Sequence, residues 1–421
     1  MTNETIRSGL ATRSGLAIRA IETVRVAEHP NLIWVRVEAD DGTAGLGETF
    51  FGAGAVEADL HDRVWPLIAG RDPLGVDAIA RDLVPYVGHR STGVEGRANS
   101  AIDIALWDLW GRATNQPIAQ LLGGFTRDCI RTYNTCAGPG YMKRAEGQRT
   151  GNYGLGANAR QDGSGTHPLD DLDAHLNRAG DLAEELLGEG ITAMKIWPFD
   201  AAAEASHGRD IDGPTLRACL RPFEQIRERV GDRMEVMVEF HSMWQLLPAL
   251  RIARALEPFG TYWHEDPIRM DSLASLRRYA EVSAAPVCAS ETLGSRWAFR
   301  DYLETGAAGV VMLDLSWCGG LSEARKIAAM AEAWHLPVAP HDCTGPVVLA
   351  ASTHLSLNAT NALVQESVRA FLRTWYAEIA TGLPTVTHGM IAPADAAGHG
   401  VDLHPDLERV RTVTRRRSTQ P

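Results

Sequence analysis

The sequence predicts an α/β protein in which an α+β domain precedes a closed barrel of parallel strands. From residue 130 onward, short apolar runs alternate with helical patterns, which is typical of strands joined by helical crossovers. Eight such runs occur, and eight strands close a (β/α) barrel. Polar residues also follow six of these runs at nearly constant spacing. The chain length of 421 residues favours two domains over one.

The first part of the chain predicts an extension and an α+β domain. RSGLA occurs twice within residues 1–17, and we expect this segment to be disordered. The domain is expected over 18–129. Residues 33–37 are rich in β-forming side chains and precede a turn signal, whereas apolar residues recur at helical spacing over 99–114. Strands followed by helices favour an α+β domain.

The barrel is expected over 130–382. Its strands are predicted at 130–134, 192–196, 236–239, 262–265, 287–290, 310–314, 338–340 and 363–365. Helices are predicted between them at 172–187, 213–229, 244–256, 272–282, 297–305, 321–333 and 352–359. A polar, glycine-rich insertion, 137–168, follows the first strand and so lies at the catalytic face. It is either a lid over the substrate or a loose insertion.

Titratable residues stand where successive predicted strands end. They are Glu239, Glu265, Glu291, Asp314, His341 and Glu366. The steps between them are 26, 26, 23, 27 and 25 residues, about the length of one βα unit when ~250 residues make eight units. Each step therefore returns the chain to the same rim, where the active sites of such barrels lie.

Three of these residues have the pattern of a metal site, and two others have the pattern of a general base with its carboxylate partner. Any one of Glu239, Glu265 and Glu291 would pass for a solvated loop residue. Together, on adjacent strands, they suit a hard cation such as Mg²⁺, which removes the repulsion between carboxylates. Asp314 and His341 end neighbouring strands. A carboxylate that accepts from one imidazole nitrogen leaves the other nitrogen free to act as a base.

Composition narrows the classes of partner. The 41 lysines and arginines are outnumbered by 53 acidic residues, giving a net charge of −12, which argues against a broad nucleic-acid surface. No stretch has the length of a membrane span, and the start lacks a secretory signal. Six scattered cysteines form no CxxC pair. We expect a cytoplasmic protein with reduced thiols and a solvated basic tail at 415–417.

With these residues in place, the chain resembles the enolase superfamily, in its mandelate racemase–like branch. A helix that ends in Ala-Leu-Trp-Asp, followed by Leu-Leu-Gly-Gly, is similar to the signature of the family's cap domain. Trp-His-Glu-Asp-Pro, and an Asp followed after four residues by Gly-Gly, are similar to its barrel signatures. These motifs occupy 101–108, 121–124, 263–267 and 314–320.

The resemblance implies a (β/α)7β barrel (TIM-like) with a capping domain formed by 18–129 and the C-terminal segment 383–421. It implies Mg²⁺ on Glu239, Glu265 and Glu291, and it suggests a homo-oligomer. The first ligand is usually Asp in the family. Glu239 is one methylene longer, so the metal position or coordination mode is expected to shift.

The family's chemistry begins with removal of the proton α to a carboxylate. Racemases of the branch carry Lys-x-Lys on the second barrel strand. Here Lys195 matches the first lysine, but Trp197 stands at the second and cannot move a proton. Racemisation between two bases is therefore disfavoured. His241, two residues after Glu239, resembles the second proton-transfer histidine of the family's sugar-acid dehydratases.

The resemblance therefore implies dehydration of an aldonate or aldarate to a 2-keto-3-deoxy acid. His341, oriented by Asp314, removes the α-proton, and His241 protonates the departing β-hydroxyl. Lys195 and Glu366 are expected at the substrate carboxylate. Two alternatives stay open. One is an isomerase, either an epimerase or a cycloisomerase, that uses the same first step. The other is a non-catalytic, metal-dependent binding or regulatory protein.

Overall fold

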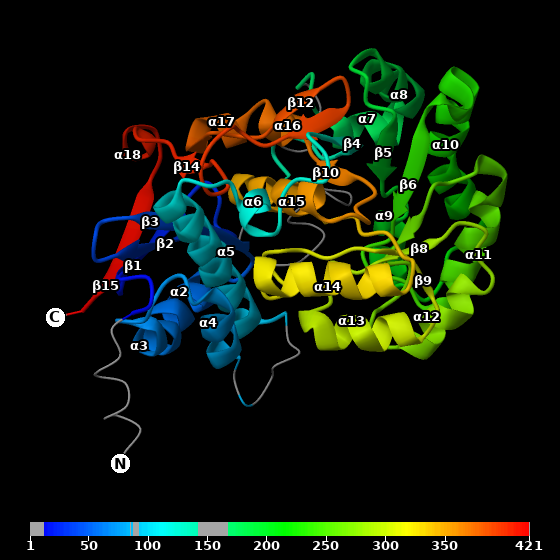
Figure 1. The fold of residues 1–421 in the computed structure, drawn as a ribbon. Helices are drawn as coiled ribbons and strands as arrows, with labels where there is room; N and C mark the ends of the chain where they lie inside the picture. The colour runs from blue at the N-terminus through cyan, green and yellow to red at the C-terminus, as the bar shows by residue number, and fades with distance from the viewer. Residues whose placement is uncertain (1–11, 85, 87–91, 142–166, 421) are drawn as a thin grey trace.

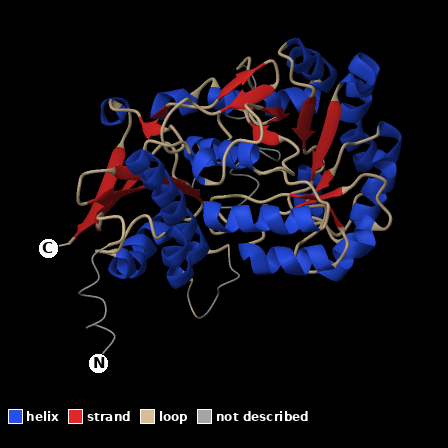
Figure 2. Cartoon of the chain, viewed as in Figure 1, coloured by secondary structure: helices blue, strands red, loops and turns tan. Residues whose placement is uncertain are grey.

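The computed structural model describes residues 12–84, 86, 92–141 and 167–420. The chain forms two connected parts, a cap and a barrel (Figure 1). The cap contains the first strands and helices and also the last strand, so the first and last described residues lie on its side of the molecule. The barrel consists of parallel strands surrounded by helices (Figure 2).

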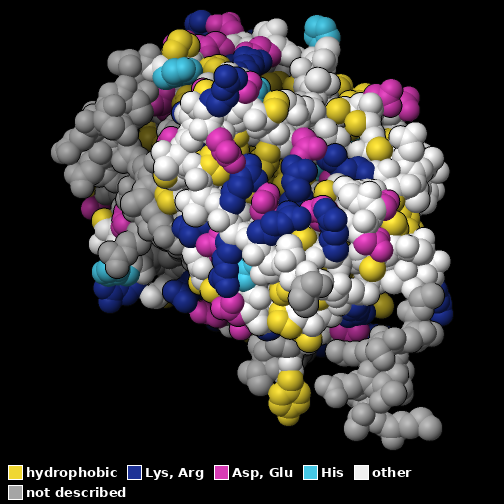
Figure 3. All heavy atoms as spheres, turned by 90° about the vertical axis from the view of Figure 1, so that its left-hand side faces the viewer, with side chains coloured by type: hydrophobic (Ala, Val, Ile, Leu, Met, Phe, Trp, Pro, Cys, Tyr) yellow, Lys and Arg dark blue, Asp and Glu magenta, His cyan; other side chains and the backbone are white. Residues whose placement is uncertain are grey.

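The cap is built on a four-stranded antiparallel sheet in the order β15-β1-β2-β3. Its strands are β1 (Ile18–Val26), β2 (Leu32–Ala39), β3 (Ala44–Phe50) and β15 (Val413–Thr419). The expected tail at 415–417 is instead part of strand β15, because residues 413–419 pair with residues 20–26 of β1, whereas the arginine side chains are exposed to solvent as expected. The arginines at 415–417 form ion pairs with Glu22, Asp62 and Glu38. Figure 3 accordingly shows Lys and Arg side chains interspersed with Asp and Glu on this face.

Helices cover one side of the cap sheet. They are α2 (Ala53–Asp59), α3 (Trp65–Ile68), α4 (Val76–Leu83), α5 (Val94–Thr114) and α6 (Ile118–Leu121), with a π-helical turn, η1 (Leu60–Val64), between α2 and α3. The helix α5 begins five residues before the predicted start. It packs directly on β3, because a Cβ atom at Gly47 would lie 1.9 Å from the carbonyl oxygen of Ala101. This close packing fixes α5 relative to the cap sheet.

Two predicted irregular segments are only partly described. Within 1–17, residues 1–11 lie outside the described residues. The rest differs from the expected disordered extension, because the Ser14 hydroxyl donates to Asp72 at 2.6 Å and the Ala17 amide donates to Asp40 at 3.0 Å. Within the insertion 137–168, residues 142–166 likewise lie outside the described residues.

The barrel sheet closes as the spacing predicts. Its strands are β4 (Ile130–Thr135), β5 (Ala193–Ile196), β6 (Glu235–Glu239), β7 (His264–Glu265), β8 (Val287–Ala289), β9 (Ala308–Val311) and β10 (Gln365–Ser367). Val338 fills the place between β9 and β10 through single bridges to Val311 and Ala362. The parallel pairing of β10 with β4 closes the ring. The predicted barrel with an α+β cap is therefore confirmed.

Seven helical crossovers separate the eight strand positions in the described chain. The main helices are α7 (Asp171–Asn177), α8 (Ala179–Gly188), α9 (Asp200–Ser206), α10 (Gly213–Val230), α11 (Leu246–Leu256), α12 (Leu273–Ala280), α13 (Ser295–Glu304), α14 (Leu321–Ala333) and α15 (Pro346–Asn358). The barrel interior holds its own apolar cluster, in which the rings of Tyr133 and Trp263 meet edge to face at 5.4 Å. The barrel is thus a packed core, and its chemistry lies at the rim.

The chain after β10 contributes elements to both the barrel and the cap. Its elements are α16 (Arg369–Leu372), α17 (Trp375–Ile379), β11 (Ala380–Thr381), β12 (Thr385–Thr387), β13 (Met390–Ala392), β14 (Asp402–Leu403) and α18 (Leu407–Val410). The hairpin of β12 and β13 extends the barrel sheet, because Ile391 pairs antiparallel with Ile130 of β4. The segment 383–421, expected in the cap as a whole, therefore begins on the barrel. It contacts the cap sheet at His399, whose Nε2 lies 2.7 Å from the Leu46 carbonyl oxygen of β3, and it joins the sheet as a strand at β15.

A buried carboxylate joins the cap to the barrel. Glu48 of β3 accepts from the Val348 amide at 3.0 Å, at the start of α15, and from the Trp34 indole at 2.6 Å. Burial raises the pKa of Glu48 to about 8, against the lowering effect of these donors.

Across the part of the chain that the structure describes, no helix has the length and apolar character needed to span a membrane.

Candidate active site

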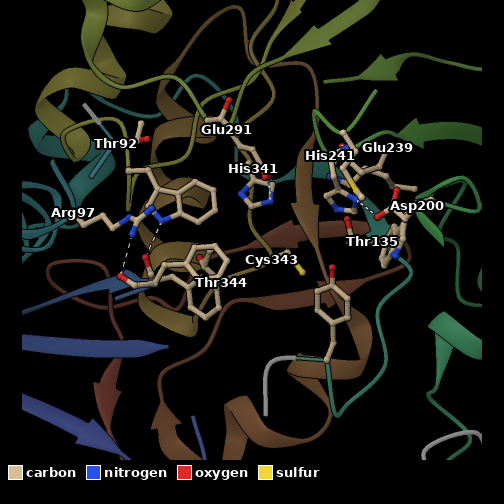
Figure 4. A pocket seen from close by; sticks show the side chains of 18 residues that line it. Thr92, Arg97, Thr135, Asp200, Glu239, His241, Glu291, His341, Cys343 and Thr344 are labelled. Atoms are coloured by element: carbon tan, nitrogen blue, oxygen red, sulfur yellow. Dashed lines mark hydrogen bonds and ion pairs between the residues drawn. The ribbon is translucent and has the colours of Figure 1, made fainter. Parts of the chain in front are cut away.

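A cavity of about 350 Å³ lies between the barrel rim and the cap (Figure 4). Such a volume is at the small end of the range for small-molecule sites. Five of the eight predicted site residues line it, namely Lys195, Glu239, His241, Glu291 and His341. The other three, Glu265, Asp314 and Glu366, are fully buried behind this lining. The structure thus brings all eight residues to one region, where five face the cavity and three lie buried behind them.

His341 and Asp314 form the expected pair. Oδ2 of Asp314 lies 2.6 Å from Nδ1 of His341, and Oδ1 accepts from the amide and hydroxyl of Ser316. The other ring nitrogen, Nε2, lies 2.5 Å from the carboxylate of Glu291. Burial lowers the pKa of His341, but Glu291, Glu366 and Asp314 outweigh it and raise the pKa well above its ordinary value. With Glu291 in this position, the surrounding carboxylates favour the protonated form of the His341 ring.

An aromatic stack holds the His341 ring. Trp317 stacks on His341 with ring centroids 5.6 Å apart, and Phe51 from the end of β3 stacks on Trp317 at 5.7 Å. The Trp317 indole also donates to the Phe50 carbonyl at 3.1 Å, and the Thr49 hydroxyl donates to the Ser316 carbonyl at 2.8 Å. The orientation of the ring is therefore set jointly by the barrel and the cap.

His241 has a carboxylate partner that the sequence analysis missed. Its Nδ1 lies 2.6 Å from Oδ2 of Asp200, which begins α9 and is 1% exposed (Figure 4). Burial lowers the pKa of His241, but Asp200 and Glu239 outweigh it and raise the pKa to about 9. Because Asp200 holds Nδ1, Nε2 is the atom available to exchange a proton with a ligand in the cavity.

Glu239 and His241 share the cavity because the chain turns between them, and not because they lie on one face of a strand. Strand alternation would place residues two apart on one face, but β6 ends at Glu239 and His241 has a left-handed φ of 49°. The chain therefore leaves the strand before His241. Glu239 accepts from the amides of Phe240 and His241 at 2.9 and 2.5 Å, which stabilises this turn.

Lys195 is surrounded by carboxylates. Its Nζ lies 2.6 Å from Glu265, 2.9 Å from Glu366 and 3.5 Å from Glu239. Burial lowers the pKa of Lys195, but these glutamates outweigh it and raise the pKa well above its ordinary value. Glu366 also accepts from the Asp342 amide at 2.9 Å. Lys195 and Glu366, expected at the substrate carboxylate, are therefore bonded mainly to each other and to Glu265.

The carboxylates at the rim have a composition suited to a divalent cation. Glu239 and Glu265 share a hydrogen bond, and burial together with Glu239 raises the pKa of Glu265 well above its ordinary value. Asp266, which the sequence analysis did not assign, is buried beside them with no hydrogen bond to its Oδ1 among the described residues. This oxygen-only, strongly acidic donor set fits Mg²⁺.

The cluster is not preformed as a cage. Within residues 12–84, 86, 92–141 and 167–420, no three His, Cys, Asp or Glu side chains surround a common point at metal-binding distance. The contact between Glu291 and His341 is one physical reason, since it directs Glu291 to the imidazole. A metal held by Glu239, Glu265 and Glu291 thus stays a prediction that requires Glu291 to turn.

Among the lining residues that the sequence analysis did not assign, three bear on the chemistry or charge of the site. Asp200 lies four residues beyond β5, and an isolated acid so close to a strand end was the available signal. Trp317 lies three residues beyond Asp314, within the same rim loop. Arg97 reaches the cavity from α5 in the cap, and nothing in its local pattern separates it from a surface arginine.

Comparisons with known proteins identify the family. Residues 12–123 match the mandelate racemase / muconate lactonizing enzyme N-terminal domain, and residues 178–407 match the enolase C-terminal domain-like family. A D-galactonate dehydratase of Ralstonia nicotianae is 30% identical over 91% of this chain and 92% of its own length. The D-galactonate dehydratase of Klebsiella pneumoniae is 28% identical over 92% of both chains.

Solved structures agree with this match. An enolase of the mandelate racemase subgroup from Agrobacterium tumefaciens is 61% identical, with a TM-score of 0.84 over 96% of this chain and 99% of that one. An enolase from the Sargasso Sea environmental genome is 41% identical, with a TM-score of 0.84 over 96% of this chain and all of that one. The chain therefore belongs to the enolase superfamily, with the two-domain organisation of its mandelate racemase branch.

Proposed function

We propose that the protein is a hydro-lyase that dehydrates a sugar acid, an aldonate or aldarate, to a 2-keto-3-deoxy acid. The observation that carries this proposal is a pair of histidines lining one cavity, each tied to a buried aspartate. His341 is held by Asp314, and His241 is held by Asp200. Elimination of water needs one group to take a proton and another to give one. The names of the curated relatives support the same reaction class.

His341 is the proposed base. Because Asp314 holds Nδ1, the α-proton of the substrate would pass to Nε2, the atom that faces Glu291 in the structure. A base must be neutral before it accepts a proton, so His341 has to be released from Glu291. A cation that bound Glu291 would compete with the imidazole for that carboxylate and lower the pKa of His341.

His241 is the proposed acid. Its raised pKa of about 9 keeps the ring protonated at neutral pH, as a proton donor requires. The Cα–H bond breaks as its proton passes to His341. The Cβ–O bond breaks as His241 supplies a proton and water leaves. The resulting enol tautomerises to the 2-keto acid, and both histidines return to their starting states by proton exchange with solvent.

Mg²⁺ is the proposed cofactor, with Glu239, Glu265 and Glu291 as its ligands. When bound, such a cation would bind the substrate carboxylate and stabilise the negative charge that develops when the α-proton is removed. Lys195 and Glu366 would then act from behind the ligands. The ammonium group of Lys195 balances the charge of Glu265, and Glu366 holds that ammonium in place.

The test is dehydration of a library of aldonates and aldarates with Mg²⁺, read as 2-keto acid formation. We expect His341→Asn to abolish both dehydration and exchange of the α-proton with D₂O. We expect His241→Asn to slow dehydration far more than exchange. His207→Asn is a matched control, because His207 is exposed at the end of α9 in a left-handed conformation that Asn tolerates.

Two outcomes would count against the proposal. A folded, metal-loaded protein that forms no 2-keto acid from any library member is not this dehydratase. Exchange of the α-proton, or a rearranged acid, without keto-acid formation would point to the isomerase alternative instead.

A further inference from the structure

One side of the cavity carries a positive charge that the proposed reaction does not use. Of the lysines and arginines in the described chain, two line the cavity, Lys195 and Arg97. Lys195 is committed to three glutamates. Arg97 comes from the first turns of α5 in the cap and is half-buried. The cap therefore presents a guanidinium group to the ligand space.

The geometry keeps this guanidinium close to the cavity wall. It lies over the Phe51 ring, 5.6 Å from the centroid, and its Nη1 donates to the Phe51 carbonyl over a long 3.4 Å. Phe51 and Gly52 both have left-handed φ values, 73° and 66°, which turn the chain sharply at the end of β3. The bend directs the Phe51 carbonyl and ring to the same arginine.

Arg97 stands apart from the acid–base residues. Figure 4 shows Arg97 and Thr92 on one side of His341, and His241 with Asp200 on the other side. In this view Glu239 lies on the side of His241, and Glu291 lies beside His341, between the two sides. A ligand that spans the cavity thus meets strong acidity and proton donors at one end and a guanidinium at the other.

We propose that the substrate is a sugar diacid, an aldarate, and that Arg97 determines this preference by binding the carboxylate remote from the reacting carbon. The inference rests on the proposed function, which places the first carboxylate at the metal ligands. The planar fork of Arg matches a carboxylate with two parallel hydrogen bonds. The cavity of about 350 Å³ suits a small, polar ligand of this kind.

An aldonate would fit the same cavity less well. Its remote end is a hydroxymethyl group, which offers Arg97 a neutral partner instead of an anion. A hydrogen bond between charged groups is roughly twice as strong as one between neutral groups. We therefore expect the aldarate to be preferred over the matched aldonate by about 10- to 100-fold in kcat/KM. The curated relatives are named for D-galactonate, a monoacid, so the preference would set this chain apart from them.

The first test compares aldarate and aldonate pairs of the same stereochemistry, such as galactarate and D-galactonate, in wild type and in Arg97→Met and Arg97→Lys. We expect kcat/KM of Arg97→Met to fall at least tenfold further for the aldarate than for the aldonate, with Arg97→Lys in between. Arg25→Met is the matched control, because Arg25 is a half-buried cap arginine that pairs with Glu57 and does not line the cavity.

A second measurement separates this inference from the proposed reaction. Adipate and hexanoate have equal chain length and lack hydroxyl groups, so their binding to the Mg²⁺-loaded protein needs no catalysis. Trp197 and Trp317 line the cavity and provide a fluorescence signal. We expect adipate to bind at least about tenfold more tightly than hexanoate to wild type, and we expect this ratio to collapse towards one in Arg97→Met.

The outcomes are decisive in both directions. Three results would overturn the role of Arg97. They are equal losses of kcat/KM on the diacid and the monoacid in Arg97→Met, an unchanged ratio of adipate to hexanoate affinity in that variant, and no measurable binding of adipate. A wild-type preference for aldonates would overturn the substrate class. If no sugar acid is dehydrated but the binding ratio collapses in Arg97→Met, the dehydratase proposal fails while the diacid site stands.

Discussion

Asp200→Asn tests the assignment of His241 as the acid. Asn has nearly the same shape as Asp but carries no charge. Oδ2 of Asp200 bonds to His241 at 2.6 Å, whereas Oδ1 has no hydrogen-bond partner among the described residues. The new amide can therefore direct its oxygen to the imidazole and its NH₂ group to the unpartnered position. We expect the variant to fold and to keep His241 oriented.

The size of the effect follows from the pKa of His241. Burial lowers this pKa, and Asp200 followed by Glu239 raises it from 6.5 to about 9. At ~1.4 kcal/mol per pKa unit, the net stabilisation of the charged ring is about 3 kcal/mol. The His241 side chain is 27% exposed, and Glu239 contributes to the effect. We assign Asp200 about 1.5–2 kcal/mol, which corresponds to a roughly 10- to 30-fold loss in the dehydration rate.

The sign of the pH effect is fixed by the proton that His241 must carry. The acid form is present below the folded-state pKa and disappears as the pH rises through it. Removing Asp200 lowers that pKa. The alkaline limb of the dehydration profile should therefore move to lower pH by about one unit or more, measured at saturating Mg²⁺ for both proteins.

The assay compares two rates in each protein, dehydration and exchange of the α-proton with D₂O. In the proposed mechanism exchange uses His341 and not His241, so we expect it to fall much less than dehydration. Asp212→Asn is the matched control, since Asp212 is an exposed helix N-cap and Asn is an equally good cap. Equal losses in the two rates, or a pH profile that superimposes on that of wild type, would refute the reasoning.

Three further substitutions test the metal site, the barrel and the joint with the cap. Glu291→Gln should weaken Mg²⁺ binding at least ~10-fold in calorimetry, because a charged oxygen ligand is lost. Arg369→Met leaves the fully buried Asp171 without its two-point partner at 2.7 and 2.8 Å. This substitution should lower the free energy of unfolding by about 3–5 kcal/mol and Tm by roughly 5–10 °C. Adding Asp171→Leu should restore much of the lost stability. Gly345→Ala would place a Cβ atom 2.3 Å from the carboxyl carbon of Glu48 and should lower Tm by about 2–6 °C.

Each of these three substitutions has a matched control variant and a result that would contradict the prediction. Glu281→Gln is exposed and should leave Mg²⁺ binding unchanged, so equal affinity in Glu291→Gln would remove that residue from the site. Arg373→Met alters a half-exposed arginine in the same network, and a Tm loss as large as that of Arg369→Met would contradict the burial argument. Gly188→Ala adds a methyl group in open space, and Gly345→Ala should differ clearly from it in thermal unfolding.

The barrel and its rim could be predicted because their signals are local and repeat. Each strand is a short apolar run, and each rim residue follows at the length of one βα unit. The first and last residues of the strands were less predictable. Val338 makes single bridges where a strand over 338–340 was expected, and β10 (Gln365–Ser367) begins where its predicted run ends. Burial inside the barrel makes neighbouring residues apolar whether or not they pair.

Contacts between distant parts of the chain could not be predicted. The arginines at 415–417 look like a solvated tail locally, but their strand pairs with β1 almost 400 residues earlier. The family resemblance implied that Lys195 lies at the substrate carboxylate. Its three glutamate partners come from three other strands, and their distances depend on how the barrel closes. Asp200 was missed for the same reason, since its partner His241 follows the next strand.

The stack of Phe51, Trp317 and His341 has a consequence for how this protein can change its substrate. Phe51 also supports Arg97, so the cap loop that we propose to select the ligand is also the loop that steadies the ring of the proposed base. Exchanging this loop for that of a relative would alter selectivity and turnover together. New specificities should therefore be reached by replacing Arg97 or Thr92 singly, which spares the ring support, and not by transplanting loops as interchangeable parts.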